Sequence, residues 1–95
     1  ESIASKTIFG EKVPKFSSTK AFTGHTLAAA ASIEAVISVL TLQNQLLFFF
    51  FYFTTPIKET GLIPETQLLH VPINTVLSNS FGFGGNCSSL IFKKI

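Results

Sequence analysis

The sequence predicts an α/β fold, in which a long apolar helix packs against strands that end in an antiparallel hairpin. Residues Thr26–Gln43 carry a helical pattern, whereas Asn74–Ser80 and Asn86–Lys94 are strand-like runs joined by a glycine-rich turn. Apolar residues make up 46% of the 95 residues and charged residues only 13%, where an ordinary soluble domain has about 25%. A chain this small cannot hide so much apolar surface, so we expect part of it to face a partner.

The first twenty residues are expected to form a helix end, a loop and a short strand. Glu1–Phe9 has a helical pattern, and Gly10 is a suitable residue to end it. Gly10–Lys15 is then a surface loop. Phe16–Lys20 is predicted to be a short strand that places Lys20 at its end, where functional groups often gather.

The pattern of Thr26–Gln43 predicts a buried helix. Its polar positions recur at steps of four, three and four, which places them in one narrow stripe: Glu34, Ser38, Thr41 and Gln45. The rest of the helix surface is apolar, and a helix that is apolar nearly all round is buried on most sides.

A strand and a long loop are expected after the helix. Leu46–Phe53 is predicted to be a buried strand, because aromatic side chains favour the pleated surface and Pro56 ends the run. Its uninterrupted aromatic residues also have strong cross-β potential. Thr54–His70 is predicted to be a loop. We do not expect a membrane span over Ala35–Phe53, because Gln43-Asn44-Gln45 interrupts it and a spanning helix needs about 20 apolar residues.

The charged, histidine and cysteine residues exclude several functions. The net charge is only +2 and, apart from Lys93-Lys94, the lysines are scattered, so no nucleic-acid surface is predicted. The two His and the single Cys lack metal-ligand spacing, and neither a metal nor a cofactor is predicted. Cys87 has no partner for an internal disulfide and is expected to be a small packing residue in a reducing, cytoplasmic compartment. His70 is expected to lie on the surface.

Three motifs follow one another along the chain. They are Ser18-Thr19-Lys20, the turn Thr23-Gly24-His25-Thr26-Leu27 and the hairpin Ser78-Asn79-Ser80-Phe81-Gly82-Phe83-Gly84-Gly85. With these motifs, the chain resembles the C-terminal half of the β-ketoacyl-[acyl-carrier-protein] synthases over almost its whole length. The resemblance implies the C-terminal part of a thiolase-like layered sandwich, with the helix between sheets and a mixed sheet that ends in an antiparallel hairpin. Residues 1–95 would form one C-terminal domain fragment of a longer enzyme.

The resemblance also implies an activity. β-Ketoacyl synthases carry out a decarboxylative Claisen condensation of an acyl thioester with malonyl-carrier protein, in fatty-acid or polyketide-type chain elongation. The expected partners are acyl carrier protein, malonyl and acyl thioesters, the N-terminal half of the same enzyme and, in the complete protein, a second subunit of a homodimer or of a ketosynthase-pair heterodimer. The nucleophilic Cys and the first His of the family belong to the missing half, so this chain is expected to be inactive alone.

His25, Lys20 and Phe83 are the candidate catalytic residues. His25 precedes a helix, whose positive N-terminal end disfavours the imidazolium and keeps the ring a neutral N–H donor. The resemblance assigns this donor to the malonyl thioester carbonyl and the Phe83 amide to the oxyanion hole. It places Lys20 with Glu1 in a supporting charge network, because a buried Lys needs a carboxylate partner.

The glycine-rich hairpin turn is the candidate gate of an acyl pocket. Asn79 is expected to shape the turn and to belong to the supporting network, while glycine allows backbone conformations that make the turn movable. The expected gate residues are Phe81, Gly82, Phe83, Gly84 and Gly85.

Other interpretations of the same residues stay open. His25 can be a loop histidine bonded to the backbone, Lys20 a solvated residue, and the Phe-Gly turn a tight turn with two core aromatic residues. For the whole chain, the alternatives are a non-catalytic partner subunit of a ketosynthase pair and a small apolar binding or membrane-associated protein organised around the Phe run.

The chain departs from the family pattern at a few positions. Ala28 and Ala31 stand where the family usually has Gly, and Asn86-Cys87 where it usually has Thr-Asn. The run Leu46–Phe53 replaces a proline-containing extended segment. Because each alanine adds a methyl group where relatives allow close backbone approach, we expect a pocket of altered shape.

Overall fold

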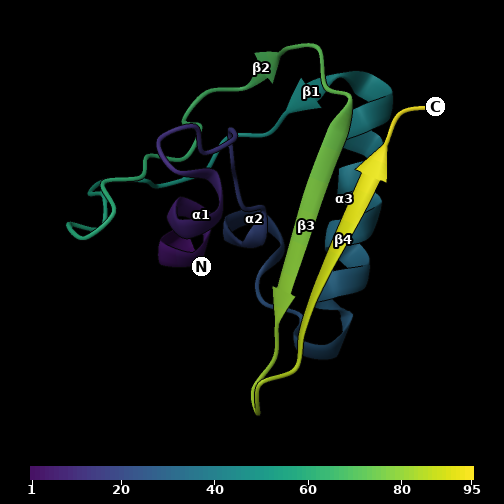
Figure 1. Cartoon of the computed structure of the whole chain (residues 1–95). Coiled ribbons are helices and arrows are strands. Elements are labelled where there is room, and N and C mark those ends of the chain that lie inside the picture. The colour runs from purple at the N-terminus through teal and green to yellow at the C-terminus, as the bar shows by residue number, and fades with distance from the viewer.

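The computed structural model describes all 95 residues (Figure 1). It contains one long α-helix, two short α-helices, one 3₁₀ turn and two separate antiparallel sheets of two strands each. In chain order these are α1 (Ser2–Phe9), α2 (Lys20–Thr23), η1 (Leu27–Ala29), α3 (Ala30–Asn44), β1 (Leu46–Leu47), β2 (Leu69–His70), β3 (Thr75–Phe81) and β4 (Cys87–Lys93).

The predicted hairpin is confirmed. Strands β3 and β4 pair in antiparallel register from Thr75 opposite Lys93 to Phe81 opposite Cys87. The turn between them holds Gly84 and Gly85 at φ 87° and 88°, a conformation that side chains with a Cβ rarely adopt. The three-glycine sequence therefore fits the geometry that closes the hairpin.

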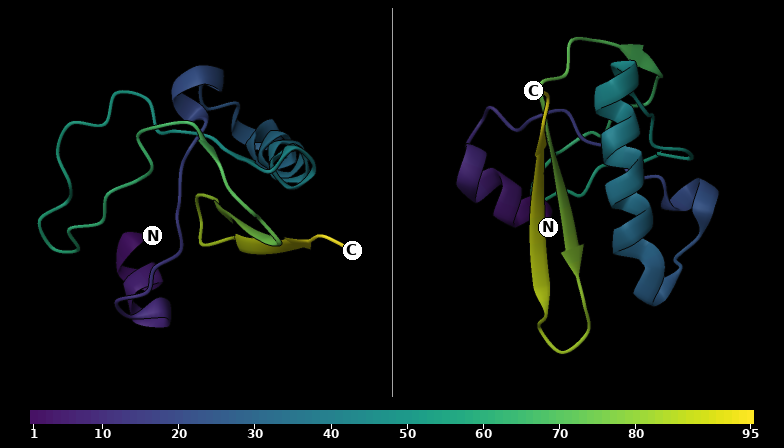
Figure 2. Two further views of the ribbon diagram at one scale, coloured as in Figure 1. Left: turned by 90° about the horizontal axis from the view of Figure 1, so that it is seen from above. Right: turned by 90° about the vertical axis from the view of Figure 1, so that its right-hand side faces the viewer.

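Helix α3 packs along the hairpin, and both views of Figure 2 place it between the hairpin and α2. The predicted helix is confirmed, but its predicted burial is wrong. Within α3 the buried residues include Ser38 and Thr41 from the polar stripe, whereas Val36 is 60% exposed. The hairpin covers only one side of α3, so several of its other apolar side chains, among them Val36 and Leu40, stay exposed within this chain. The Ser38 hydroxyl tolerates burial because it donates a 2.8 Å hydrogen bond to the Glu34 carbonyl.

The N-terminal elements are partly as predicted. Helix α1 ends where expected, with Gly10 at φ 62° and its amide bonded to the Lys6 carbonyl at 2.8 Å. The predicted strand Phe16–Lys20 is wrong, because no strand lies beside it. Its one backbone hydrogen bond to a distant segment runs from the Glu65 amide to the Phe16 carbonyl at 3.0 Å, and Lys20 already begins α2.

The strand predicted over Leu46–Phe53 is also wrong beyond its first two residues. Only Leu46–Leu47 forms a strand, and it pairs with Leu69–His70, which the sequence placed in a loop. The aromatic run that follows lacks the two-residue alternation of a strand, and its rings pack on one another instead. Tyr52 lies at φ 59°, which bends the chain there.

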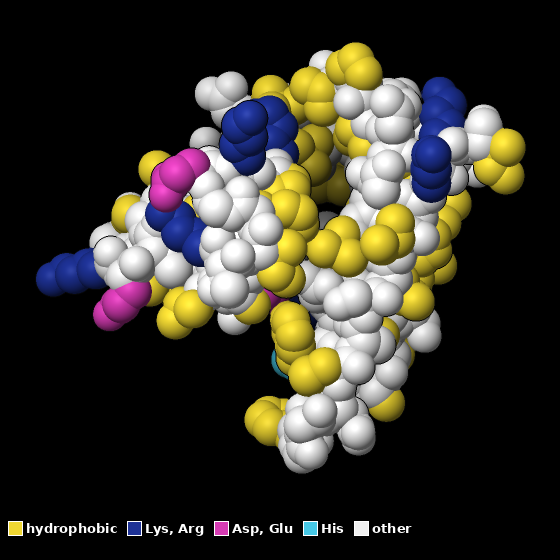
Figure 3. All heavy atoms as spheres, in the orientation of Figure 1, with side chains coloured by type: hydrophobic (Ala, Val, Ile, Leu, Met, Phe, Trp, Pro, Cys, Tyr) yellow, Lys and Arg dark blue, Asp and Glu magenta, His cyan; other side chains and the backbone are white.

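Little of the chain is enclosed. Only five of the 95 residues are buried, and Leu42 is the only large apolar residue among them. Figure 3 shows hydrophobic side chains spread over the visible face. The helical segment Leu27–Asn44 is long and apolar enough to cross a bilayer, a property that core helices of soluble proteins share.

Gln45 joins the end of α3 to the start of β3. It ends the helix in the left-handed conformation, at φ 53° and ψ 42°. Its side-chain amide donates to the carbonyls of Leu42 (2.7 Å) and Ile73 (2.8 Å), and its side-chain oxygen accepts from the Ile73 amide at 2.8 Å. One side chain therefore satisfies two backbone groups just before β3.

Replacement of Gln45 by alanine should loosen this junction. The variant leaves the Ile73 amide and carbonyl without partners, so we expect the complete protein to lose about 1–3 kcal/mol of unfolding free energy. The exposed neighbour Gln43 is the matched control, and Gln43→Ala should change stability by less than about 0.5 kcal/mol. Urea unfolding measures both, and equal midpoints for the two variants would contradict this role of Gln45.

Candidate active site

A cavity of about 430 Å³ lies between the N-terminal end of α3 and the turn end of the hairpin. The structure brings six of the predicted site residues to its wall, although they come from both ends of the sequence: Glu1, Lys20, His25, Asn79, Phe81 and Gly82. The remaining three, Phe83, Gly84 and Gly85, lie in the same turn but outside the wall. The predicted juxtaposition of His25 and Lys20 with the start of the glycine turn is therefore present.

His25 lies just before η1 and α3, and the backbone fixes the orientation of its ring. The Leu27 amide donates a 3.1 Å hydrogen bond to Nδ1 of His25. Since Nδ1 is an acceptor, the neutral ring carries its proton on Nε2. Leu27 itself has φ 51°, a left-handed conformation that is strained for a residue with a Cβ. The local fold therefore presents His25 as an Nε2–H donor.

Lys20 has a carboxylate partner that sequence analysis missed. Its ammonium is paired with Glu34 of α3, whereas Glu1, the partner expected from the resemblance, lines the same cavity without a recorded bond to Lys20. The side chains of Lys20 and Glu34 are 42% and 20% exposed, so the pair contributes only about 0–1 kcal/mol to stability. Its main effect is to hold α2 against the first turns of α3.

Glu34 was predicted only as part of the polar stripe of the helix. The i, i+4 spacing places Ala30 and Glu34 on one face of α3, and both line the cavity. Its distance from Lys20 in sequence is 14 residues, so only the turn between the two helices brings the charges together. The available sequence signal for this ion pair was the opposite charge of Lys20 and Glu34, on two helical segments joined by a short turn.

The hairpin turn is tied at its base and free at its tip. The Gly82 amide donates to the Asn86 carbonyl at 2.7 Å, and a Cβ on Gly82 would lie 3.2 Å from that same oxygen. The side chain of Phe83 at the tip is 97% exposed. Asn79 accepts a 2.7 Å hydrogen bond from the Ser89 hydroxyl across the strands, which supports the base of the turn.

Cys87 was expected to be a packing residue, and this expectation is wrong. It is exposed and lines the cavity together with Asn86 and Ser88. It lies in strand β4 rather than at a helix N-terminus, so it lacks the electropositive setting that activates a thiol. His70 is exposed in β2, as predicted. No group of three or more His, Cys, Asp or Glu side chains is placed to hold a metal ion.

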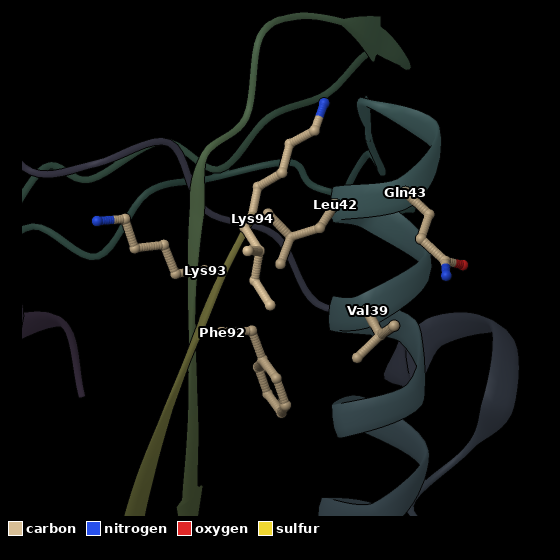
Figure 4. A pocket seen from close by; sticks show the side chains of 7 residues that line it. Val39, Leu42, Gln43, Phe92, Lys93 and Lys94 are labelled. Atoms are coloured by element: carbon tan, nitrogen blue, oxygen red, sulfur yellow. The ribbon is translucent and has the colours of Figure 1, made fainter.

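A second, smaller cavity of about 290 Å³ opens between the C-terminal end of α3 and the end of β4. Figure 4 shows Phe92 facing Val39 and Leu42 of the helix, while the side chain of Lys93 points away from it. None of the predicted site residues lines this cavity.

Comparison with known proteins identifies the family. Residues 1–50 match the model of the beta-ketoacyl synthase C-terminal domain. Over 94 residues the chain is 40% identical to 3-oxoacyl-[acyl-carrier-protein] synthase 1 of Haemophilus influenzae. The aligned region covers 96% of this chain and 23% of that protein. It is 43% identical over 88 residues to 3-oxoacyl-[acyl-carrier-protein] synthase 2 of Vibrio harveyi, and this alignment covers 90% of this chain and 21% of that protein.

A plant relative gives the same result. The mitochondrial 3-oxoacyl-[acyl-carrier-protein] synthase of Arabidopsis thaliana is 38% identical over 101 residues and covers all of this chain and 22% of its own length. The three relatives therefore agree on one family for this chain of α/β fold. The chain is a member of the β-ketoacyl synthase family, and it spans about a quarter of the length of the curated relatives it matches.

The hydrogen bond to Nδ1 leads to a prediction about the His25 tautomer. When the ring is neutral, nitrogen-15 NMR of the complete protein should show His25 with its proton on Nε2, because the Leu27 amide occupies Nδ1. His70, which has no recorded ring hydrogen bond, is the internal reference; a mixed tautomer for His25 in the unaltered protein would contradict the prediction.

Proposed function

We propose that this chain is the C-terminal part of a β-ketoacyl synthase, in which it completes the site for decarboxylative Claisen condensation. The observation that carries the proposal is the shared cavity, which His25, the Lys20–Glu34 pair and the base of the glycine turn all line. Donors that converge on one carbonyl from two distant segments are what thioester chemistry requires. The names of the relatives support the same reaction class.

The proposed reaction forms one carbon–carbon bond. The malonyl carboxylate leaves as CO₂, and its bonding electrons become the enolate of the remaining thioester. The enolate carbon attacks the carbonyl of the acyl group on the nucleophilic Cys, and the carbon–sulfur bond breaks as the thiolate leaves. His25 would donate its Nε2–H to the malonyl thioester oxygen while the enolate exists, without giving up the proton.

The hairpin turn would act on the other carbonyl. The Phe83 amide lies on the turn and makes no recorded intramolecular hydrogen bond, so it is free to donate to the developing oxyanion. The exposed Phe83 ring and the glycines beside it would form the acyl gate. Lys20 would support the site through Glu34 rather than transfer a proton, with Glu1 and Asn79 at the rim.

The remaining partners follow from the exposed apolar surface. The preceding part of the enzyme would cover the side of α3 that the hairpin leaves open and would supply the nucleophilic Cys and the first His. Acyl and malonyl groups would arrive on acyl carrier protein, which the names of the relatives include. We also propose a dimer in the complete protein and a soluble, cytoplasmic setting, with no activity for this chain alone.

Replacement of His25 tests the proposed role. In the complete enzyme, His25→Ala should reduce malonyl decarboxylation by at least about 10²-fold, because it removes one donor to the enolate oxygen. Acyl transfer to the nucleophilic Cys should remain measurable, since His25 is not assigned to thiol activation. The two half-reactions are assayed separately, and equal loss of both in a folded variant would give His25 another role.

Of the two alanines that stand where the family usually has glycine, only one lines the cavity. Ala31 lines it and Ala28 does not. We therefore expect Ala31→Gly to shift the preferred acyl-chain length. Because Ala31 lies in the first turn of α3, glycine there should cost less than the roughly 1 kcal/mol of a helix interior. Ala28→Gly is the matched control and should leave chain-length preference unchanged. If neither variant changes the acyl-chain-length preference, the alanines affect only the stability of the helix.

A further inference from the structure

We propose that Phe49 and Phe51 position His25 by clamping α2 through Phe22. This inference deepens the proposed function, because it concerns how the site donor is held. It also explains a feature that the family pattern does not: the aromatic run after α3 that replaces a proline-containing segment.

The three rings form a closed cluster. The centroid of Phe22 lies 5.7 Å from that of Phe49, with the rings nearly perpendicular, and 5.0 Å from that of Phe51. Phe49 and Phe51 lie 5.6 Å apart. All three distances fall within the range of favourable aromatic pairs, and each ring touches the other two.

Phe22 sits in an element that cannot be stable alone. Helix α2 has four residues, and a single turn of helix is far below the length at which isolated helices form. Two contacts hold it in place. Lys20 is paired with Glu34 on α3, and Phe22 packs on Phe49 and Phe51.

The path from Phe22 to His25 is short. Thr23 and Gly24 separate them, and Gly24 lies at φ 71°, where no side chain restricts the backbone. Because a glycine joint can hinge, the place of His25 depends on what fixes the segment on both sides: the anchored α2 before it and the Leu27 amide bonded to its Nδ1 after it. The Lys20–Glu34 pair is partly exposed and therefore weak, and Phe22 is itself 56% exposed, so α2 depends on both contacts.

The run itself supplies a matched control. Phe50 and Phe53 pair with each other at 6.4 Å, and neither has a recorded contact with Phe22. Phe51 and Phe53 are both partly buried and lie two residues apart. Truncation of either removes the same atoms from the same segment, but only Phe51 reaches α2.

The experiment compares Phe51→Ala with Phe53→Ala in the complete enzyme. Two readouts are measured: the His25 tautomer by nitrogen-15 NMR, and the kcat and KM of malonyl-thioester decarboxylation. We expect Phe51→Ala to produce mixed tautomers and to lower kcat by about tenfold to a hundredfold with little change in KM, since small displacements of a reacting group have effects of this size. Phe53→Ala should keep the Nε2–H tautomer and the original kcat.

Further variants keep the test decisive. Phe51→Tyr retains the ring and should restore both readouts, and Phe22→Leu, which retains apolar volume, should shift them in the same direction as Phe51→Ala even where the alanine variant folds poorly. Equal behaviour of Phe51→Ala and Phe53→Ala, or an unchanged tautomer in Phe51→Ala and Phe22→Leu, overturns the clamp. A changed tautomer with unchanged decarboxylation supports the clamp and overturns the catalytic role of His25.

Discussion

The antiparallel arrangement of α3 and β3 is the constraint on which the site depends (Figure 1). Gln45 fixes the end of α3 to Ile73, and β3 then runs back along the helix. The 15 residues of α3 rise about 22 Å and the seven residues of β3 extend about 23 Å. Because the lengths match, the end of β3 arrives beside the start of α3, and the glycine turn meets His25.

This constraint explains why so open a chain carries an ordered site. The cavity is built from the start of α3, the segment before it, the turn end of the hairpin and Glu1, all of which the chain contains. The rest of α3 is a scaffold with one covered side. Extensive burial is therefore not needed to bring these residues together: few residues of the chain are buried, yet six of the predicted site residues line one cavity.

Sequence reasoning succeeded where the signal was local. The hairpin and the helix follow from glycine positions and periodicity, whereas the motif residues around the cavity follow from the resemblance to the β-ketoacyl synthases. The failures concern contacts between distant segments. Phe16–Lys20 has strand-like residues but no strand beside it, and Glu34 became a site residue only through the turn that brings Lys20 to it. Ser38 and Thr41 of the polar stripe are buried although most apolar residues of α3 are not, because the hairpin packs on only one side of the helix, which periodicity alone cannot reveal.

The matched lengths of α3 and β3 also determine where the chain can gain or lose residues. One residue inserted in α3 would turn every following side chain by about 100° and separate Gln45 from Ile73, because the helix has 3.6 residues per turn. One residue inserted in β3 would exchange its two faces. Between β1 and β2, the aromatic run packs on α2 and Glu65 bonds to Phe16, but the segment of residues 54–64 makes only local backbone hydrogen bonds. Insertions and deletions during divergence should therefore accumulate in that segment and avoid α3 and β3.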